Sequence, residues 1–307
     1  MDPTNERPEK ESLRREDCLL PDGSLNSLGL LSGIVAFIQQ AYPELALSPP
    51  VALRASTSYH VELEDISRTM GEMHQATNTE DATGVAKTID TGEYSIIVVE
   101  AGIFEWIFDE RQHLLIHTVH HELCHAHEQS IHRQRGIVMP ETVNYFRRIA
   151  EAIWSEYQAE RRSAGTHFGE NQQASILIER LDKLRQQQAQ LIGEFRADLN
   201  LGITGGKAFG LVWDILSMLR YTLGCMAGTS QTPEELYEGL GQALDRSPLK
   251  DLWKPLMGVL DHLYATLGNW ESLDVFAPLE NMIRPTFNAF GYDVRETADG
   301  GLQVRLL

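Results

Sequence analysis

The chain of 307 residues predicts an α+β fold with a small N-terminal sheet and a mostly helical C-terminal half. Strand-like patterns are concentrated in residues 51–100 and at the C-terminal end of the chain. Between these regions, apolar residues recur at helical spacings of three and four. A chain of this length can bury a sizeable core as one large domain or two smaller ones.

Residues 1–20 are predicted to form a disordered tail, since residues 1–17 are almost entirely polar and carry charges of both signs. The apolar segment 25–42 predicts a buried helix. No basic stretch directly precedes it, so a secretory signal is not expected.

Two segments carry strand patterns. Residues 59–64 alternate between apolar and polar side chains, as in a half-buried strand. The β-branched run in residues 94–100 predicts a second strand, and residues 94–99 are expected to form a sheet edge that could take up an extended peptide. The alternative is an internal strand already paired on both sides. Residues 74–92 predict a long loop or a wide hairpin connection, which either lines a substrate cleft or is disordered.

A helix predicted for residues 103–129 carries the motif His121-Glu122-Leu123-Cys124-His125. Residues four apart lie on one face of a helix, one turn from each other. The two imidazoles can therefore bind the same zinc ion, Zn²⁺, and Glu122 can act as general base on a zinc-bound water. HExxH on a helix that follows a strand is the context in which this motif indicates a zinc peptidase.

A catalytic zinc usually has three protein ligands and an open position for water. A second helix is predicted to begin at Pro140 and to continue to Arg162. Its candidate third ligands are Glu141, Glu151, Glu156 and Glu160. Trp154 and Tyr157 flank Glu156 with apolar bulk, which favours a partly buried position for this carboxylate.

HExxH followed by a glutamate on the next helix resembles the gluzincin branch of the zincin metallopeptidases. The resemblance covers roughly residues 94–165 and implies a zincin-like catalytic region over residues 21–165. It implies His121, His125 and Glu156 as zinc ligands, with Glu122 as the catalytic base. Glu160 would then hold a ligand imidazole through its other ring nitrogen. The Glu156-x-x-Ala159 spacing is also similar to that of bacterial peptidases related to ImmA and IrrE, which act in phage-repressor and stress control.

Other ligand sets are present on the same helix. Four histidines form a series at intervals of four: His113, His117, His121 and His125. The helix face rotates by about 40° at each such step, so three of them cannot converge on one ion without help from a neighbouring element. His120 and Cys124 lie on another face, and Cys124 is interpreted as a small buried hydrophobic residue. The metzincin branch is excluded, because Glu128 and Ile131 stand where it has glycine and histidine.

Residues 166–307 predict a helical region with a terminal β-hairpin. Residues 173–200 form an amphipathic helical pattern, and the glycine-rich segment 202–210 predicts a helix break rather than a phosphate-binding loop. Residues 232–235 form a capping box that begins a further helix. The two strands predicted in 292–306 are separated by an Asp-Gly-Gly turn.

Composition and charge limit the kinds of partner and compartment that are expected for this protein. The formal net charge of −18 argues against a broad basic surface for nucleic acid, and no apolar stretch is long enough to span a membrane. The 3 cysteines are an odd, widely spaced set, which favours a reducing compartment, and we expect a cytoplasmic protein.

The leading hypothesis is an intracellular zinc-dependent metallopeptidase acting on a protein or peptide, and a selective regulatory protease is one form of it. The alternative is a non-catalytic zincin-like module for regulation or interaction, and a third hypothesis is hydrolysis of a non-peptide bond. Glu122 favours catalysis, because a structural zinc has no use for a general base. Tyr157, His167 and His262 are candidates for the oxyanion donor by residue type.

Overall fold

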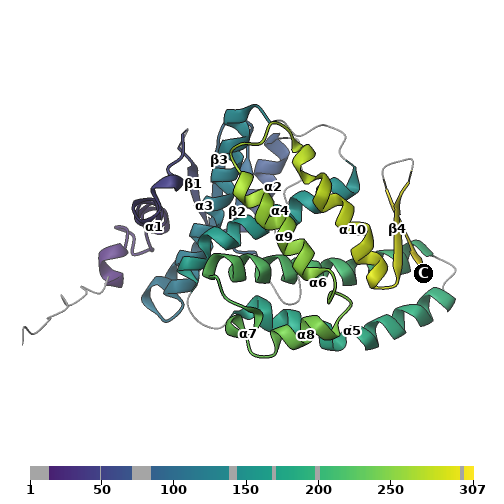
Figure 1. Cartoon of the computed structure of the whole chain (residues 1–307). Coiled ribbons are helices and arrows are strands. Elements are labelled where there is room, and N and C mark those ends of the chain that lie inside the picture. Colours follow the sequence, from purple (N-terminus) through teal and green to yellow (C-terminus); the bar gives the residue numbers. More distant parts are fainter. Residues whose placement is uncertain are drawn as a thin grey trace, which may run out of the picture.

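The computed structural model describes residues 14–48, 50–70, 84–137, 144–167, 171–197, 201–297 and 301–307. Glu141 and most of the predicted N-terminal tail lie outside these residues. The fold is α+β, with a three-stranded sheet near the N-terminus and a two-stranded hairpin at the C-terminus, joined by helices (Figure 1).

The N-terminal helix packs one apolar face onto the sheet region. α1 (Ser27–Ala41) begins at Asn26, whose side chain accepts a hydrogen bond from the Gly29 amide at 3.0 Å. Leu31 and Ile38 of α1 are fully buried, which confirms the predicted buried helix. Short 3₁₀ helices flank it at η1 (Arg15–Cys18) and η2 (Pro43–Leu45). Cys18 is buried, so the end of the predicted disordered tail is ordered.

The three-stranded sheet has the order β1-β3-β2. Its strands are β1 (Ala52–Ser56), β2 (Ala86–Asp90) and β3 (Ser95–Glu100). β3 pairs with β1 in parallel and with β2 antiparallel, so it is the central strand. The predicted sheet edge at residues 94–99 is therefore wrong. Among the described residues the edge on this side is β2, which lies within the segment predicted as a loop; residues 74–83 of that segment lie outside the described part.

The strand predicted at residues 59–64 is also wrong. These residues begin α2 (Tyr59–Met70). Tyr59, Leu63 and Ile66 are its buried residues, and their spacing of four and three is that of one helix face. Val61, the middle apolar residue of the alternation, is 56% exposed, and packing of Tyr59, Leu63 and Ile66 with β3 selects the helix.

Two long helices carry the candidate site. α3 (Gln112–Arg135) begins later than predicted, because residues from Ala101 to Phe108 form the 3₁₀ helix η3. It ends at Gly136, whose φ of +66° is the left-handed conformation that suits glycine. α4 (Tyr145–Ser163) is capped by Asn144, and the short η4 (Ala164–Thr166) follows it.

The C-terminal half is helical. It contains α5 (Gln172–Ala197), α6 (Leu201–Thr229), α7 (Pro233–Leu236), α8 (Leu240–Arg246), α9 (Trp253–Thr266), η5 (Leu273–Phe276), α10 (Ala277–Ala289), β4 (Tyr292–Glu296) and β5 (Leu302–Leu306). The predicted amphipathic helix, capping box and terminal hairpin are confirmed. The predicted helix break at 202–210 is wrong, because these residues lie inside α6, where Gly205 packs beside Val304 of the hairpin.

Two cores meet at α4. One lies among α4, α5, α6 and α8 to α10 and includes Trp154 and Tyr157. The other lies between α1, the sheet and α3, and includes Ala159 of α4. Because α4 contributes to both, its polar positions lie at the junction between the two halves of the chain.

α6 approaches α4 unusually closely through two glycines. A Cβ atom at Gly224 would lie 2.7 Å from the Tyr157 carbonyl oxygen, and one at Gly228 would lie 2.6 Å from the Ala164 side chain. Any side chain at these positions would force the helices apart. The glycines therefore allow α6 to reach the polar face of α4.

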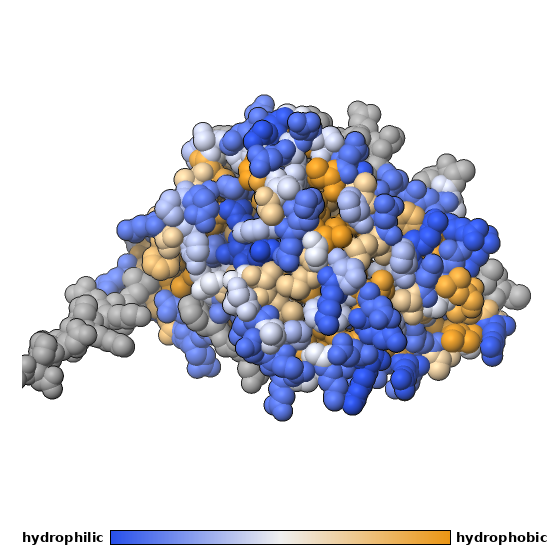
Figure 2. Space-filling model, in the orientation of Figure 1, coloured by the Kyte–Doolittle hydropathy of each residue, from blue (hydrophilic) through white to orange (hydrophobic). Residues whose placement is uncertain are grey.

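Hydrophilic residues cover most of the face seen in Figure 2, with hydrophobic residues in separate patches between them. Among the described residues, no helix combines the length and apolar character needed to cross a membrane.

Candidate metal centre

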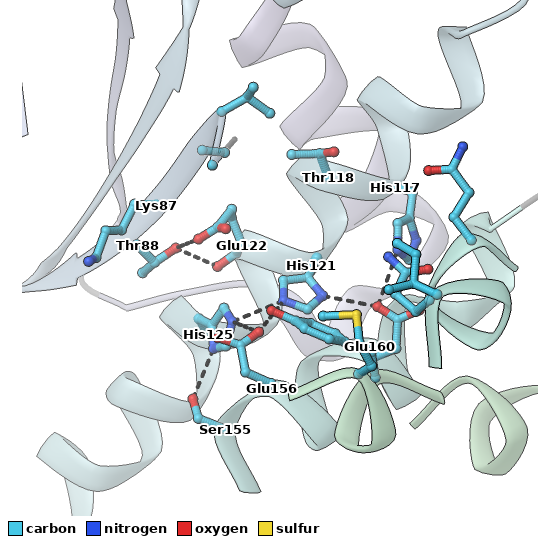
Figure 3. Close-up of a pocket in the computed structure, with 18 of the residues that line it drawn as sticks. Lys87, Thr88, His117, Thr118, His121, Glu122, His125, Ser155, Glu156 and Glu160 are labelled. Atoms are coloured by element: carbon cyan, nitrogen blue, oxygen red, sulfur yellow. Dashed lines mark hydrogen bonds and ion pairs between the residues drawn. The ribbon is translucent and has the colours of Figure 1, made fainter. Parts of the chain in front are cut away.

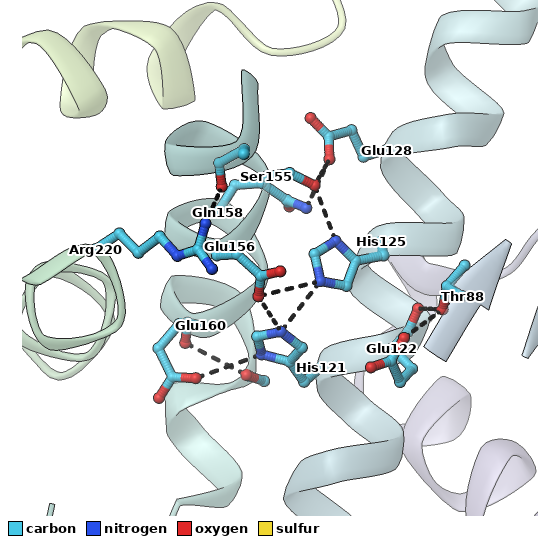
Figure 4. Close-up of polar contacts among 12 residues, drawn as sticks. Thr88, His121, Glu122, His125, Glu128, Ser155, Glu156, Gln158, Glu160 and Arg220 are labelled. Carbon is cyan, nitrogen blue, oxygen red and sulfur yellow. Dashed lines mark hydrogen bonds and ion pairs between the residues drawn. The ribbon is translucent and has the colours of Figure 1, made fainter. Parts of the chain in front are cut away.

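The structure brings His121 and His125 of α3 together with Glu156 of α4 (Figure 4). The His121 Nε2 atom lies 3.1 Å from His125 Nε2 and 3.1 Å from Glu156 Oε2. His125 Nε2 lies 3.6 Å from the same carboxylate oxygen. Three side-chain atoms from two helices thus form a small triangle.

The outer contacts of the two imidazoles determine which nitrogens face this triangle. His125 Nδ1 lies 3.0 Å from the Ser155 hydroxyl, which itself donates to Glu128 Oε2 at 3.0 Å. Since that hydroxyl hydrogen is used, His125 Nδ1 must be the donor to Ser155. His121 Nδ1 lies 3.4 Å from the Glu160 carboxylate, which also only accepts. Both histidines in their neutral forms therefore present the lone pair of Nε2 to the triangle.

When both imidazoles are neutral, three acceptor atoms face one another, and this arrangement fits a cation. In tetrahedral zinc sites with bonds of about 2.0–2.2 Å, ligand atoms are separated by about 3.3–3.6 Å. The separations here, 3.1 Å and 3.6 Å, are close to these values. The outer partners of His121 and His125 are of the kind that fix ligand imidazoles in metal sites. The residues present thus fit a zinc ion held by two histidines and one glutamate.

The electrostatics of the triangle favour a positive charge. Burial raises the pKa of Glu156, but the contacts with His121 and His125 outweigh it and, with the charge of Arg220, hold that pKa well below its usual range. Burial lowers the pKa of His121, yet its hydrogen bonds to Glu156 and Glu160 raise it to about 10. Without a metal, a proton on His121 supplies the charge that the carboxylates attract.

Zinc uptake is expected to release a proton. With a pKa of about 10, His121 is protonated at pH 7 in the metal-free protein, and zinc requires its neutral form. About one proton should leave per zinc bound, so the apparent zinc affinity should rise about tenfold per pH unit between about pH 6 and 8. Calorimetric titration in buffers of different ionisation enthalpy measures this. A binding heat that is the same in all buffers would contradict it.

Glu122 lies beside the triangle, in a cavity of about 540 Å³ lined by β2, α3, α4, α5 and α6 (Figure 3). It is 9% exposed, and the Thr88 hydroxyl of β2 lies 2.7 Å from its Oε2. Figure 3 shows His121 between the Glu122–Thr88 pair and the His117–Glu160 pair. Glu122 thus faces the same cavity as the three acceptor atoms without being one of them.

Tyr221 of α6 is a site residue that the sequence did not indicate. It lines the cavity close to Glu156, and its ring centroid lies 6.0 Å from that of His121. Burial, together with the Glu156 charge, raises the pKa of Tyr221, so its hydroxyl stays protonated as a donor. Within a long apolar helix, the tyrosine carries no pattern that links it to HExxH.

The Cys–His alternative does not fit the structure. Cys124 is fully buried, and burial raises the pKa of its thiol to about 12, which disfavours the thiolate that zinc requires. Burial also lowers the pKa of His120 to about 3, and its Nδ1 contacts Thr166 at 3.1 Å. Neither residue lines the cavity.

Cys124→Ser is accordingly expected to leave zinc content unchanged, although loss of a buried sulfur lowers the free energy of unfolding by about 1–2 kcal/mol. Elemental analysis of purified protein measures the zinc. Loss of metal in a folded Cys124→Ser variant would restore the Cys–His pair as ligands.

The remaining sequence candidates lie outside the cavity. Glu151 lies on α4 and is absent from the cavity lining. The Tyr157 hydroxyl donates to Asp261 of α9 at 2.7 Å, and His262 is exposed on that helix. The ring of His167 contacts His117 with a centroid distance of 4.9 Å. In the described part of the chain, none of the three predicted oxyanion donors therefore lines the cavity.

Comparison with known proteins identifies no relative. No protein-family model, curated protein or solved structure matches the chain. The resemblance to gluzincins therefore stays a prediction that depends on the motif and on the geometry of this site.

Proposed function

We propose that this chain is a zinc-dependent peptidase with a zincin-like core. The observation that carries the proposal is the triangle of acceptor atoms from His121, His125 and Glu156. These three residues and Glu122 line the same cavity. The same spacing of HExxH and a later glutamate led to the prediction from sequence. All three cysteines are free and buried, as suits the reducing compartment that we infer for this enzyme.

Each residue of the site has a role in peptide hydrolysis. A bound zinc ion would supply the Lewis acidity that activates water and polarises the scissile carbonyl. Glu122 accepts the proton of the attacking water and later delivers it to the leaving amine. Thr88 donates a hydrogen bond to the Glu122 carboxylate and so fixes its orientation. Ser155 and Glu160 keep the two imidazoles in the tautomer that binds metal.

β2 offers a binding site for an extended substrate. Its residues 86–88, together with the preceding residues 84 and 85, line the cavity at the edge of the sheet. A peptide that adds to this edge forms main-chain hydrogen bonds and runs past Glu122. The proposal thus assigns to β2 the role that the sequence had suggested for residues 94–99.

Tyr221→Phe is expected to lower kcat by about 10²-fold, because one donor to the developing oxyanion is lost. Tyr221 lines the cavity beside the triangle, with its ring centroid 6.0 Å from that of His121. Steady-state kinetics at saturating zinc measure the effect, with Tyr264→Phe on α9 as a matched control. If zinc affinity falls while kcat is unchanged in the loaded variant, Tyr221 only supports the ligand Glu156.

Incubation of the zinc-loaded protein with a mixture of defined peptides tests the function. Cleavage products are identified by mass spectrometry, before and after metal removal by a chelator and again after zinc is restored. The proposal expects cleavage that requires zinc and Glu122. Stoichiometric zinc without cleavage of any peptide or protein substrate would instead favour a regulatory module that keeps the metal.

A further inference from the structure

A second group of two histidines and a carboxylate lies next to the candidate centre. It consists of His117 on α3, Glu160 on α4 and His167 after η4, and its potential ligand atoms lie within 4.8 Å of one another. Glu160 is one turn after Glu156 on α4. His117 Nε2 lies 3.3 Å from Glu160 Oε2, a distance between those found in the first triangle.

The ring geometry of the second group repeats that of the first. The rings of His117 and His167 have a centroid distance of 4.9 Å and an interplanar angle of 81°. For His121 and His125 the values are 4.8 Å and 73°. Each pair therefore presents its imidazoles edge to face, beside a carboxylate from the same face of α4.

One oxygen of the buried Glu160 carboxylate receives no hydrogen bond from the described residues. His117 Nδ1 lies 3.3 Å from the Ser163 carbonyl oxygen, which can only accept, so this nitrogen carries the proton. In neutral His117, Nε2 is then an acceptor, yet it faces an oxygen of the Glu160 carboxylate. Glu160 Oε1 has no hydrogen-bond partner among the described residues, although this side chain is only 2% exposed. A buried carboxylate oxygen without a partner is costly unless a cation or a donor satisfies it.

We propose that His117, Glu160 and His167 bind a second divalent cation, separate from the candidate catalytic zinc. Two imidazole nitrogens and one carboxylate oxygen are a donor set that favours zinc among the common divalent cations. The ion would lie between Nε2 of His117 and the unsatisfied oxygen of Glu160. It would replace the repulsion of two facing acceptors by two coordinate bonds.

This ion would act on the first site through Glu160 alone. Glu160 reaches His121 at Nδ1, whereas the first triangle uses Nε2 on the other side of the ring. The two ions would thus be separated by an imidazole and a carboxylate, too far apart to share one water. Its role is to fix Glu160, which orients His121, and to fasten the segment after η4 to α3.

Zinc stoichiometry tests the second site independently of catalysis. The wild type should bind two zinc ions per chain in equilibrium dialysis followed by elemental analysis. His167→Ala should bind one, and the double variant His125→Ala/Glu156→Gln should also bind one, at the second site. His113→Ala, on the same helix but outside both groups, serves as the control and should bind two. Circular dichroism confirms that each variant is folded.

The outcomes separate the two sites. One zinc in the wild type, retained in His167→Ala and lost in the double variant, would overturn the second site and leave the first. In that case the contact between His117 and Glu160 holds no metal ion. One zinc in the wild type, lost in His167→Ala and retained in the double variant, would support the second site and refute the ligand set on which the proposed function depends.

Discussion

Glu122→Gln is expected to lower kcat for peptide hydrolysis by about 10³-fold, within the range typical of a lost general base. The amide keeps the size of the side chain and can still contact Thr88, but it cannot accept a proton from water. Glu122 does not belong to the triangle of acceptor atoms, so zinc content should stay at the wild-type level. The measurement is kcat and KM on a peptide identified as a substrate, with zinc determined in the same samples.

Glu110→Gln is the control for this substitution, since Glu110 is exposed and lies just before α3. It should leave both kcat and zinc content unchanged. Full activity of Glu122→Gln would refute the proposed mechanism. Loss of zinc from Glu122→Gln would instead mean that this carboxylate helps to hold the metal.

Glu156→Ala is expected to have the largest effect on metal binding. It removes one of three converging acceptor atoms and leaves only His121 and His125 facing each other. Loss of a direct ligand should weaken zinc binding by more than the factor of about 10–100 that is typical when an outer partner of a ligand is lost. Competition with a chromogenic chelator measures the affinity, and peptide cleavage should disappear at zinc concentrations that saturate the wild type.

Glu151→Ala provides a matched control, because Glu151 lies on the same helix but not in the cavity. Burial raises the pKa of Glu151 to about 7, so its removal at pH 7 takes away only about half of one negative charge. Its zinc affinity should equal that of the wild type. An unchanged affinity in Glu156→Ala would require the third ligand to be sought elsewhere, with Glu160 the nearest remaining carboxylate on α4.

The local geometry of the site was predictable because helical spacing fixes it. His121 and His125 are one turn apart, and so are Glu156 and Glu160, so each pair had to share a face once the helices formed. The sequence could not give the angle between α3 and α4 that makes these faces meet. It also could not give the Ser155–Glu128 contacts, because both side chains would equally suit a solvated helix surface.

The predictions that were wrong or incomplete share one cause, because tertiary packing overrides the local sequence pattern at each of these places. Residues 59–64 alternate like a strand, but burial of Ile66 against β3 favours the longer helix. β2 is short and partly polar, so its pairing with β3 decides its conformation more than its own composition does. Tyr221 reaches the site only because α6 packs against α4. It lies more than 50 residues after Glu156, and no local sequence pattern predicts that contact.

The close contact of α6 with α4 changes how variants of this protein should be interpreted. Gly224 and Gly228 set the separation of the two helices, and Tyr221 lies on α6 one turn before the first of them. A methyl group at either glycine would move the phenol away from Glu156 without touching any reacting atom. In a mutational screen, these glycines would therefore score like catalytic residues, and a fragment that ends at residue 165 would keep the motif but lose a wall of the cavity.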